Sequence, residues 1–118
     1  MAISLIIDPA GVRIEDTTDG IAQGPSLTTS ITVTEHHANN KISVASASET
    51  SIPFGAVAAA KALIVITSAA TTIKLNGEST GHTFNPLFVW TDSAGGITSA
   101  AVTQSSGSAV VMKFLVAG

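Results

Sequence analysis

The chain has 118 residues and a mass of 11.8 kDa, and hydrophobic residues make up 45% of it while charged residues make up only 11%. The formal net charge is −3 and the five basic residues are scattered, which argues against nucleic-acid binding because that function needs a clustered basic face. The absence of cysteine excludes disulfides and thiolate metal sites, and no apolar run reaches the ~18 residues that a membrane helix needs.

The low charge also bears on assembly. A free monomer of this size normally carries many Lys, Arg, Asp and Glu side chains on its surface. Here 15 Thr and 14 Ser residues supply much of the polar surface instead. We therefore expect a homo-oligomer, either a trimer or a dimer, or a subunit docked on a larger surface.

The first quarter of the chain predicts a hairpin followed by a loop. Residues 3–7 are mostly apolar and are closed by the turn residues Asp8-Pro9-Ala10-Gly11. Residues 12–15 alternate between apolar and charged side chains, so we expect them to pair back on the first run. Residues 16–26 contain two Gly, one Pro and two Asp, a composition typical of a loop.

The next stretch predicts two strands and a corner. Residues 27–35 alternate between larger side chains and Thr or Ser, which predicts a half-buried strand with a threonine-lined outer face. Residues 36–40 are typical of a turn, and residues 41–45 of the returning strand. The proline within residues 52–55 cannot donate to a central ladder, so we expect a corner there. Residues 56–60 favour a single helical turn.

The second half of the chain holds the most apolar strands. Residues 62–67 form a continuous apolar run, the pattern of a strand covered on both faces. Residues 71–75 end at Asn76-Gly77, a strong turn signal because both residue types accept positive φ. Residues 84–91 contain three of the five large aromatic side chains and are expected to form the aromatic centre of the fold.

The chain ends in two further strands. Residues 97–103 predict a strand between turns at residues 93–96 and 104–107. Residues 108–118 alternate over their whole length, so that two sets of side chains face in opposite directions. One face carries Val110, Met112, Phe114 and Val116, and the other carries Val111, Lys113 and Leu115. No polar tail follows, so we expect this strand to be held inside the fold or against a partner.

These elements predict the fold class. Eight or nine short strands joined by Gly, Asn and Ser turns are typical of an all-β protein, an antiparallel β-sandwich or jelly roll of about eight short strands. The length suits one domain, and no repeat or linker divides the chain. The sequence therefore predicts a single β-sandwich domain over residues 1–118.

One group of residues has the chemistry of metal ligands. Glu35, His36 and His37 are adjacent, and His82 would complete a site if the fold brought it near. Neighbouring side chains on a strand point to opposite faces, so adjacent histidines rarely share a zinc ion. We therefore expect polar residues at a strand end and no metal site.

No residue pattern predicts catalysis. There is no Gly-x-Ser-x-Gly elbow, no serine with a nearby His and Asp, and no phosphate-binding loop ahead of a helix. A glycosidase needs two carboxylates ~5–10 Å apart across a cleft, and the spacing selects no such pair. Asp16 and Asp19 lack the ligand spacing of an EF-hand. The expected result is a non-enzyme without cofactors, whose acids are ordinary loop residues: Asp8, Glu15, Asp16, Asp19, Glu35, Glu49, Glu78 and Asp92.

The aromatic residues of the second half have two interpretations. Phe84, Phe88 and Trp90 are spaced to form either a core cluster or a sugar-stacking platform like those of lectin-like sandwiches. So small a domain has few other large side chains to fill its centre. The core interpretation is therefore favoured for all three.

Residues 54–118 carry several structural motifs that together resemble a known family. The motifs are Lys61-Ala62-Leu63-Ile64-Val65-Ile66-Thr67, Ile73-Lys74-Leu75-Asn76-Gly77-Glu78-Ser79-Thr80, Asn85-Pro86 before Leu87-Phe88-Val89, Ile97-Thr98-Ser99, and Val111-Met112-Lys113-Phe114-Leu115-Val116-Ala117-Gly118. This part of the chain resembles small virion structural proteins of tailed bacteriophages. The resemblance implies a β-sandwich decoration, cement or minor head or tail protein, located in the virion, with the major capsid protein or other virion proteins as partners.

The expected function follows from the resemblance and the low charge. It is a non-enzymatic capsid decoration or cement subunit that stabilises the phage head by burying surface across capsomer boundaries. A tail, connector or fibre-base component is an alternative, since no sequence feature separates head from tail. A carbohydrate-binding β-sandwich module that uses Trp90 and the loop acids is an alternative of another class, and it requires Trp90 to be exposed.

Overall fold

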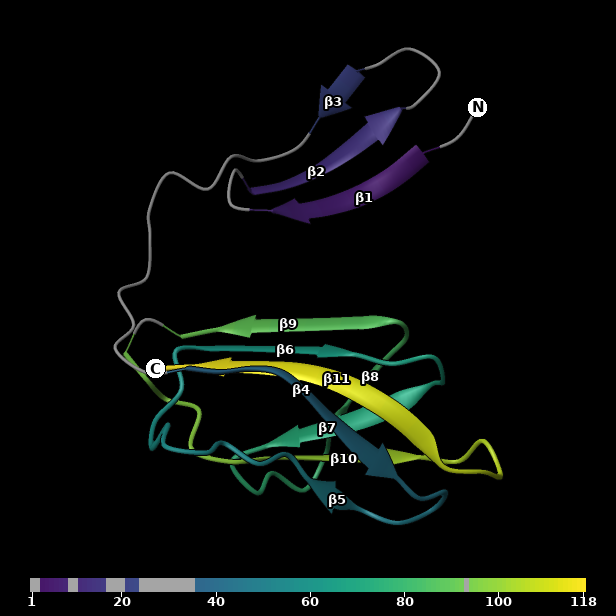
Figure 1. Cartoon of the computed structure of the whole chain (residues 1–118), viewed down its shortest axis with the longest axis vertical. Coiled ribbons are helices and arrows are strands. Elements are labelled where there is room, and N and C mark those ends of the chain that lie inside the picture. Colours follow the sequence, from purple (N-terminus) through teal and green to yellow (C-terminus); the bar gives the residue numbers. More distant parts are fainter. Residues whose placement is uncertain (1–2, 9–10, 17–20, 24–35, 93) are drawn as a thin grey trace. The chain divides into compact units, whose positions relative to one another are not determined.

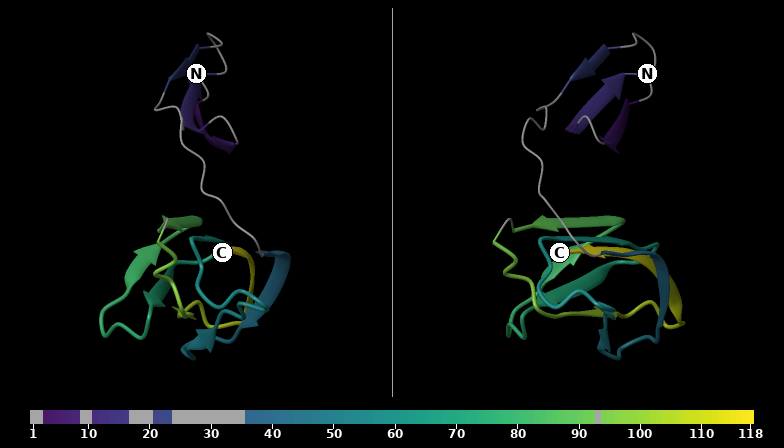
Figure 2. Two further views of the ribbon diagram at one scale, coloured as in Figure 1. Left: turned by 90° about the vertical axis from the view of Figure 1, so that its left-hand side faces the viewer. Right: turned by 60° about the vertical axis from the view of Figure 1, so that its left-hand side comes forward.

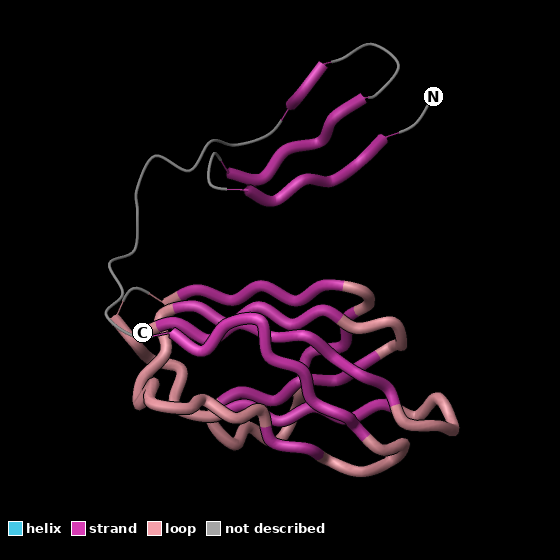
Figure 3. The backbone as a smooth tube through the Cα atoms, in the orientation of Figure 1, coloured by secondary structure: helices cyan, strands magenta, loops and turns pink. Residues whose placement is uncertain are grey.

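The computed structural model describes residues 3–8, 11–16, 21–23, 36–92 and 94–118 (Figure 1). In these ranges the regular elements are all β-strands, and no helix occurs that is long and apolar enough to cross a membrane (Figure 3). The chain divides into two compact units, residues 1–30 and residues 31–118.

The first unit contains a three-stranded antiparallel sheet. Its strands are β1 (Ile3–Asp8), β2 (Gly11–Asp16) and β3 (Ile21–Gln23), in the order β1-β2-β3. β1 and β2 form the predicted hairpin, with Asp8 opposite Gly11 at its turn. The predicted loop over residues 16–26 is wrong at β3, because this segment pairs with β2 and extends the sheet.

The second unit contains the predicted β-sandwich. In its described residues the eight strands are β4 (His36–Val44), β5 (Thr50–Ser51), β6 (Ala62–Ile66), β7 (Thr71–Leu75), β8 (His82–Phe84), β9 (Leu87–Thr91), β10 (Ala100–Gln104) and β11 (Val110–Ala117). They form two four-stranded sheets, β5-β10-β7-β8 and β4-β11-β6-β9, and all neighbouring strands are antiparallel. Figures 1 and 2 show the two layers. The sequence predicted one β-sandwich domain over residues 1–118. In the structure, both sheets of the sandwich lie within the second unit.

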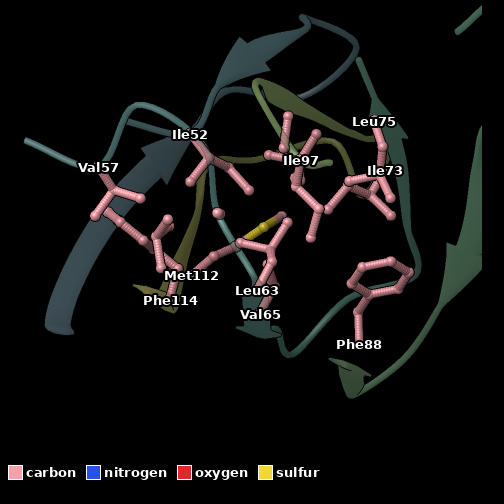
Figure 4. Close-up of a cluster of buried hydrophobic side chains, with 14 of the residues drawn as sticks. Ile52, Val57, Leu63, Val65, Ile73, Leu75, Phe88, Ile97, Met112 and Phe114 are labelled. Carbon is pink, nitrogen blue, oxygen red and sulfur yellow. The ribbon is translucent and has the colours of Figure 1, made fainter. Parts of the chain in front are cut away.

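The inner faces of the two sheets meet in one hydrophobic core (Figure 4). Alternate residues of β6, β7, β10 and β11 point into it, as the period of two requires. Several of its side chains, among them Leu63, Val65, Ile73 and Met112, are completely buried. The core consists of Val44, Ile52, Val57, Ala60, Leu63, Val65, Ile73, Leu75, Phe88, Ile97, Ala100, Val102, Met112, Phe114 and Val116.

The C-terminal strand lies at the centre of its sheet. β11 pairs with β4 on one side and with β6 on the other. Met112, Phe114 and Val116 are buried and Val111 is exposed, so the predicted division of the strand into two faces is confirmed. The Lys61 N–H donates to the Ala117 carbonyl at 2.7 Å, which fixes the segment before β6 to the end of this strand.

Gln104 connects the two sheets where β10 ends. Its buried amide donates to the Val44 carbonyl at 2.9 Å and to the Ser108 carbonyl at 2.8 Å, and its side-chain oxygen accepts the Ser106 N–H at 2.7 Å. A buried amide is tolerated only when its donors and acceptor are satisfied, as they are here. Gln104 was predicted to begin a turn. It is the last residue of the strand and holds that turn in place.

Three further sequence predictions differ from the structure. Residues 36–40 belong to β4 and do not form a turn, because pairing along β11 overrides their polar composition. Residues 56–60 form turns and bends that end in a bridge between Ala60 and Ile97, and they contain no helix. Among the described residues of the second unit, β6 is covered on one face, and Ile66 on the other face is 48% exposed. The strand predicted over residues 27–35 lies outside the described residues.

Candidate functional site

Trp90 is an exposed aromatic side chain at an edge of the sandwich. It lies on β9, an edge strand, in register with the buried Leu63 of β6, which places it on the inner face of its sheet. β8, the edge strand of the other sheet, is only three residues long. The indole is 41% exposed, so the core interpretation is wrong for Trp90. It is confirmed for Phe88, which is buried, and Phe84 packs partly buried against the core.

Neighbouring rings hold the indole in place. The rings of Phe88 and Trp90 are nearly parallel, with centroids 6.1 Å apart and an interplanar angle of 5°. The His82 imidazole lies 5.5 Å from the indole and 6.2 Å from the Phe88 ring. Phe84 packs 5.4 Å from Phe88 on the core side. The four rings therefore form a continuous row that ends at an exposed tryptophan.

A surface hollow of about 470 Å³ lies beside this tryptophan. Besides Trp90, its lining includes the polar residues Asn76, Glu78, His82 and Asp92. The β7–β8 connection supplies Asn76 and Glu78, the first residue of β8 is His82, and the loop after β9 supplies Asp92. The volume is within the ~300–1,000 Å³ range of small-molecule sites.

In each carboxylate of the hollow, one of the two oxygens accepts a hydrogen bond from the backbone. Oε1 of Glu78 accepts the Leu75 N–H at 3.0 Å and lies 3.3 Å from Nε2 of His82. Oδ1 of Asp92 accepts the Ala94 N–H at 2.9 Å. Within the described part of the chain, the other oxygen of each carboxylate has no hydrogen-bond partner. Both carboxylates are therefore fixed in position and keep one acceptor atom available.

Asn76 joins the two turns that form the hollow. Its amide donates to the Gly96 carbonyl at 2.7 Å, and its Oδ1 accepts from the Thr98 N–H at 2.8 Å and the Thr98 hydroxyl at 3.0 Å. Asn76 and Gly77 have φ of 55° and 69°, so the turn predicted at these two residues is confirmed. The polar atoms of Asn76 are used by the protein itself, which makes it a positioning residue.

The outer face of the β4-β11-β6-β9 sheet is a second candidate surface. Ile66, Val89 and Val111 on this face are 48%, 42% and 59% exposed. Ile64 lies between Val89 and Leu115 in the strand register, so the apolar side chains are continuous across three strands. A shallow depression of about 340 Å³ lies over β6 and β11. Exposed apolar side chains that adjoin one another are typical of an interaction site.

Two lysines border this apolar face. Lys41 on β4 and Lys113 on β11 are directly opposite one another in the register, and both are exposed. Like charges at directly opposite positions destabilise a sheet. Neither lysine forms an ion pair with an acid of the described residues. The described residues therefore place two cations beside apolar side chains without providing acidic counter-ions for them.

The candidate metal ligands are distributed over the two sheets. His36 and His37 lie on β4, in register with Ala117 and Val116, whereas His82 lies on β8 of the other sheet and contacts Glu78. Glu35 lies outside the described residues. Among the residues whose placement is described, no three His, Asp or Glu side chains gather to hold a metal ion.

The other acids are also accounted for in the part of the chain that the structure describes. Asp8, Glu15 and Asp16 lie in the strands of the first unit, and Glu49 is 3.9 Å from Lys74. Asp19 lies outside the described ranges. The sequence treated Glu78 and Asp92 as ordinary loop acids. Their proximity to Trp90 arises from two turns that are distant in sequence.

A scan against protein-family models and searches among curated proteins and solved structures found no match to this chain.

Proposed function

We propose that this chain is a non-enzymatic structural protein of a virion, a decoration or cement subunit that stabilises the phage head by interface burial. The observation that carries the proposal is the apolar outer face of the β4-β11-β6-β9 sheet. The resemblance of residues 54–118 to phage virion proteins supports the choice of a virion, and the low charge of the chain supports a subunit that is docked in use.

The sequence of β6 supports the idea that a partner covers this face. Its five residues, Ala-Leu-Ile-Val-Ile, are apolar on both sides, a pattern typical of strands that are covered on both faces. Leu63 and Val65 are buried in the core, but Ile66 on the other side remains 48% exposed. A partner that covers the outer face would bury the apolar side chains on the second side of β6 as well.

The lysine pair indicates the chemistry of the partner. Lys41 and Lys113 repel each other in the free chain, and a carboxylate placed between them would remove the repulsion. We propose a protein partner with apolar side chains flanked by Asp or Glu, supplied by the major capsid protein or another virion protein. Oligomerisation to a trimer or dimer would repeat this contact, and repeated contacts multiply the strength of attachment.

Cryo-electron microscopy of purified virions of the phage that encodes the chain tests the proposal. A decoration subunit follows the symmetry of the head and contacts the capsid through the outer face of the β4-β11-β6-β9 sheet. A tail, connector or fibre-base component, the alternative position, follows the tail's three- or six-fold axis. If mass spectrometry of the same virions finds none of this chain, the proposed function is wrong.

A further inference from the structure

The hollow beside Trp90 has the properties of a small-ligand site that is independent of the outer sheet face. Its apolar part is an indole that is 41% exposed on a small domain, although burial of so large a ring would release more free energy. The contacts with Phe88 and His82 fix the orientation of the indole. The hollow thus presents a flat, rigid aromatic surface to a ligand.

The polar part of the hollow accepts hydrogen bonds. Glu78 and Asp92 each keep one carboxylate oxygen available, and no lysine or arginine belongs to the lining among the described residues. The site therefore disfavours anionic ligands. It favours a ligand that has hydrogen-bond donors at its edge and an apolar face for the indole.

The geometry of the hollow exists before any ligand binds. Asn76 ties the β7–β8 turn to Gly96, and the Gly95 N–H donates to the Asp92 carbonyl at 3.0 Å. A methyl group at Gly96 would collide with the Asp92 carboxylate, so the absence of a side chain there lets the carboxylate lie against the backbone. Ordering before binding lowers the entropic cost of association.

We infer that this hollow is a binding site for a neutral saccharide. The C–H face of one sugar ring stacks on the indole of Trp90, and ring hydroxyls donate to Glu78 and Asp92. Sugars combine a flat apolar face with hydroxyl donors around the edge, and the volume of about 470 Å³ has room for such a ring.

A small organic cation is the main competing ligand, because carboxylates beside an aromatic ring also attract ammonium groups. Cation sites of this kind enclose the ligand between several ring faces. Here Phe88 is buried and does not belong to the lining of the hollow, so the lining presents the indole without a second large ring opposite it. The arrangement favours a flat neutral ring.

Fluorescence titration of the full chain tests the inference directly. Trp90 is the single tryptophan and there is no tyrosine, so intrinsic emission reports on this site. The probes are neutral trisaccharides of glucose, galactose, mannose and N-acetylglucosamine, with choline as the cationic competitor. We expect at least one trisaccharide to shift the emission to the blue, with a dissociation constant of about 0.1–1 mM. No response to any of them at about 10 mM, or displacement by equimolar choline, overturns the inference.

Isosteric variants separate the roles of the lining residues. Glu78→Gln and Asp92→Asn keep the side-chain shape, and we expect each to weaken binding about tenfold by calorimetry. Trp90→Ala should remove measurable binding, whereas the control Val111→Ala, on the outer face of another strand, should bind with unchanged affinity. Amide NMR spectra verify that each variant is folded.

Wild-type affinity in Asp92→Asn and Glu78→Gln would overturn the assigned contacts. If the wild-type chain binds a sugar but does not attach to virions, only the proposed function is contradicted.

Discussion

The two faces of the β4-β11-β6-β9 sheet are both apolar in sequence, yet they have different environments. On the inner face, Met112 and Val116 of β11 are completely buried in the core. On the outer face, Val111 of the same strand is 59% exposed and Ile66 of the neighbouring strand is 48% exposed. Hydrophobic character alone therefore does not decide which positions the chain covers by itself.

The difference distinguishes two uses of apolar surface. Inner residues contribute to the free energy of unfolding of the single chain, because water reaches them only when the sandwich opens. Outer residues contribute little to it until a partner covers them. Mutations on the inner face should therefore change stability, and mutations on the outer face should change association.

Phe114→Ala should produce the largest effect on stability. Phe114 is 4% exposed and packs in the core, so its truncation leaves a cavity costing about 3–5 kcal/mol. This is a large fraction of the ~5–15 kcal/mol that stabilises a typical domain. Urea unfolding followed by circular dichroism measures the change. The matched control is Val111→Ala on the outer face of the same strand, for which we expect a change within about 0.5 kcal/mol. Equal changes in the two variants would contradict the distinction between the faces.

Gln104→Leu should have the next largest effect. The substitution keeps most of the volume but leaves the carbonyls of Val44 and Ser108 without their donor. Buried groups that lose a partner cost about 1–3 kcal/mol each, less where water enters. We expect a loss of that order in urea unfolding, with faster hydrogen exchange at Ser106, whose N–H loses its acceptor. Unchanged exchange at Ser106 would show that the turn does not depend on this side chain.

Local patterns in the sequence predicted several elements correctly. The alternation at β11 and the Asn76-Gly77 turn depend on neighbouring residues only, and the structure confirms them. The start of β4 at His36 was not predicted, because this polar segment is extended only through pairing with a distant strand. Secondary structure that depends on long-range pairing is not visible in a local window.

The hollow beside Trp90 was less predictable than the strands. The sequence identified Trp90 but favoured a core position, since volume arguments do not reveal that β8 is short at the edge of the sandwich. Glu78 and Asp92 line the same hollow although they belong to two turns that are distant in sequence, and the Asn76 side chain joins these turns. The positive-φ signal at Asn76 predicted a turn but gave no information about its bond to Gly96.

Val111→Asp should leave the fold intact and disrupt association. Val111 is 59% exposed, so a carboxylate there remains solvated in the free chain and the free energy of unfolding should change by about 0.5 kcal/mol or less. In an apolar interface the same charge would be buried without a partner, which is strongly unfavourable. Sedimentation velocity at micromolar concentration compares the variant with wild type and with the control Val111→Thr. A wild-type monomer would contradict the expected oligomer, and a Val111→Asp oligomer identical to wild type would exclude this face from its interface.

Lys113→Glu should slightly stabilise the free chain and weaken its attachment to a partner. Lys113 lies directly opposite Lys41, so the substitution replaces a repulsive pair with an attractive one. Exposed pairs of this kind are worth about 0.2–1 kcal/mol, so the isolated chain should become slightly more stable in urea, and less so as salt rises.

Attachment of the Lys113→Glu variant to a partner that supplies carboxylates should weaken, because the variant places a negative charge where the partner has its own. Sedimentation with purified virions that lack the chain measures attachment, and Lys113→Gln separates the loss of a cation from the introduction of repulsion. An increase in stability together with undiminished attachment would mean that the lysine pair is not part of the contact.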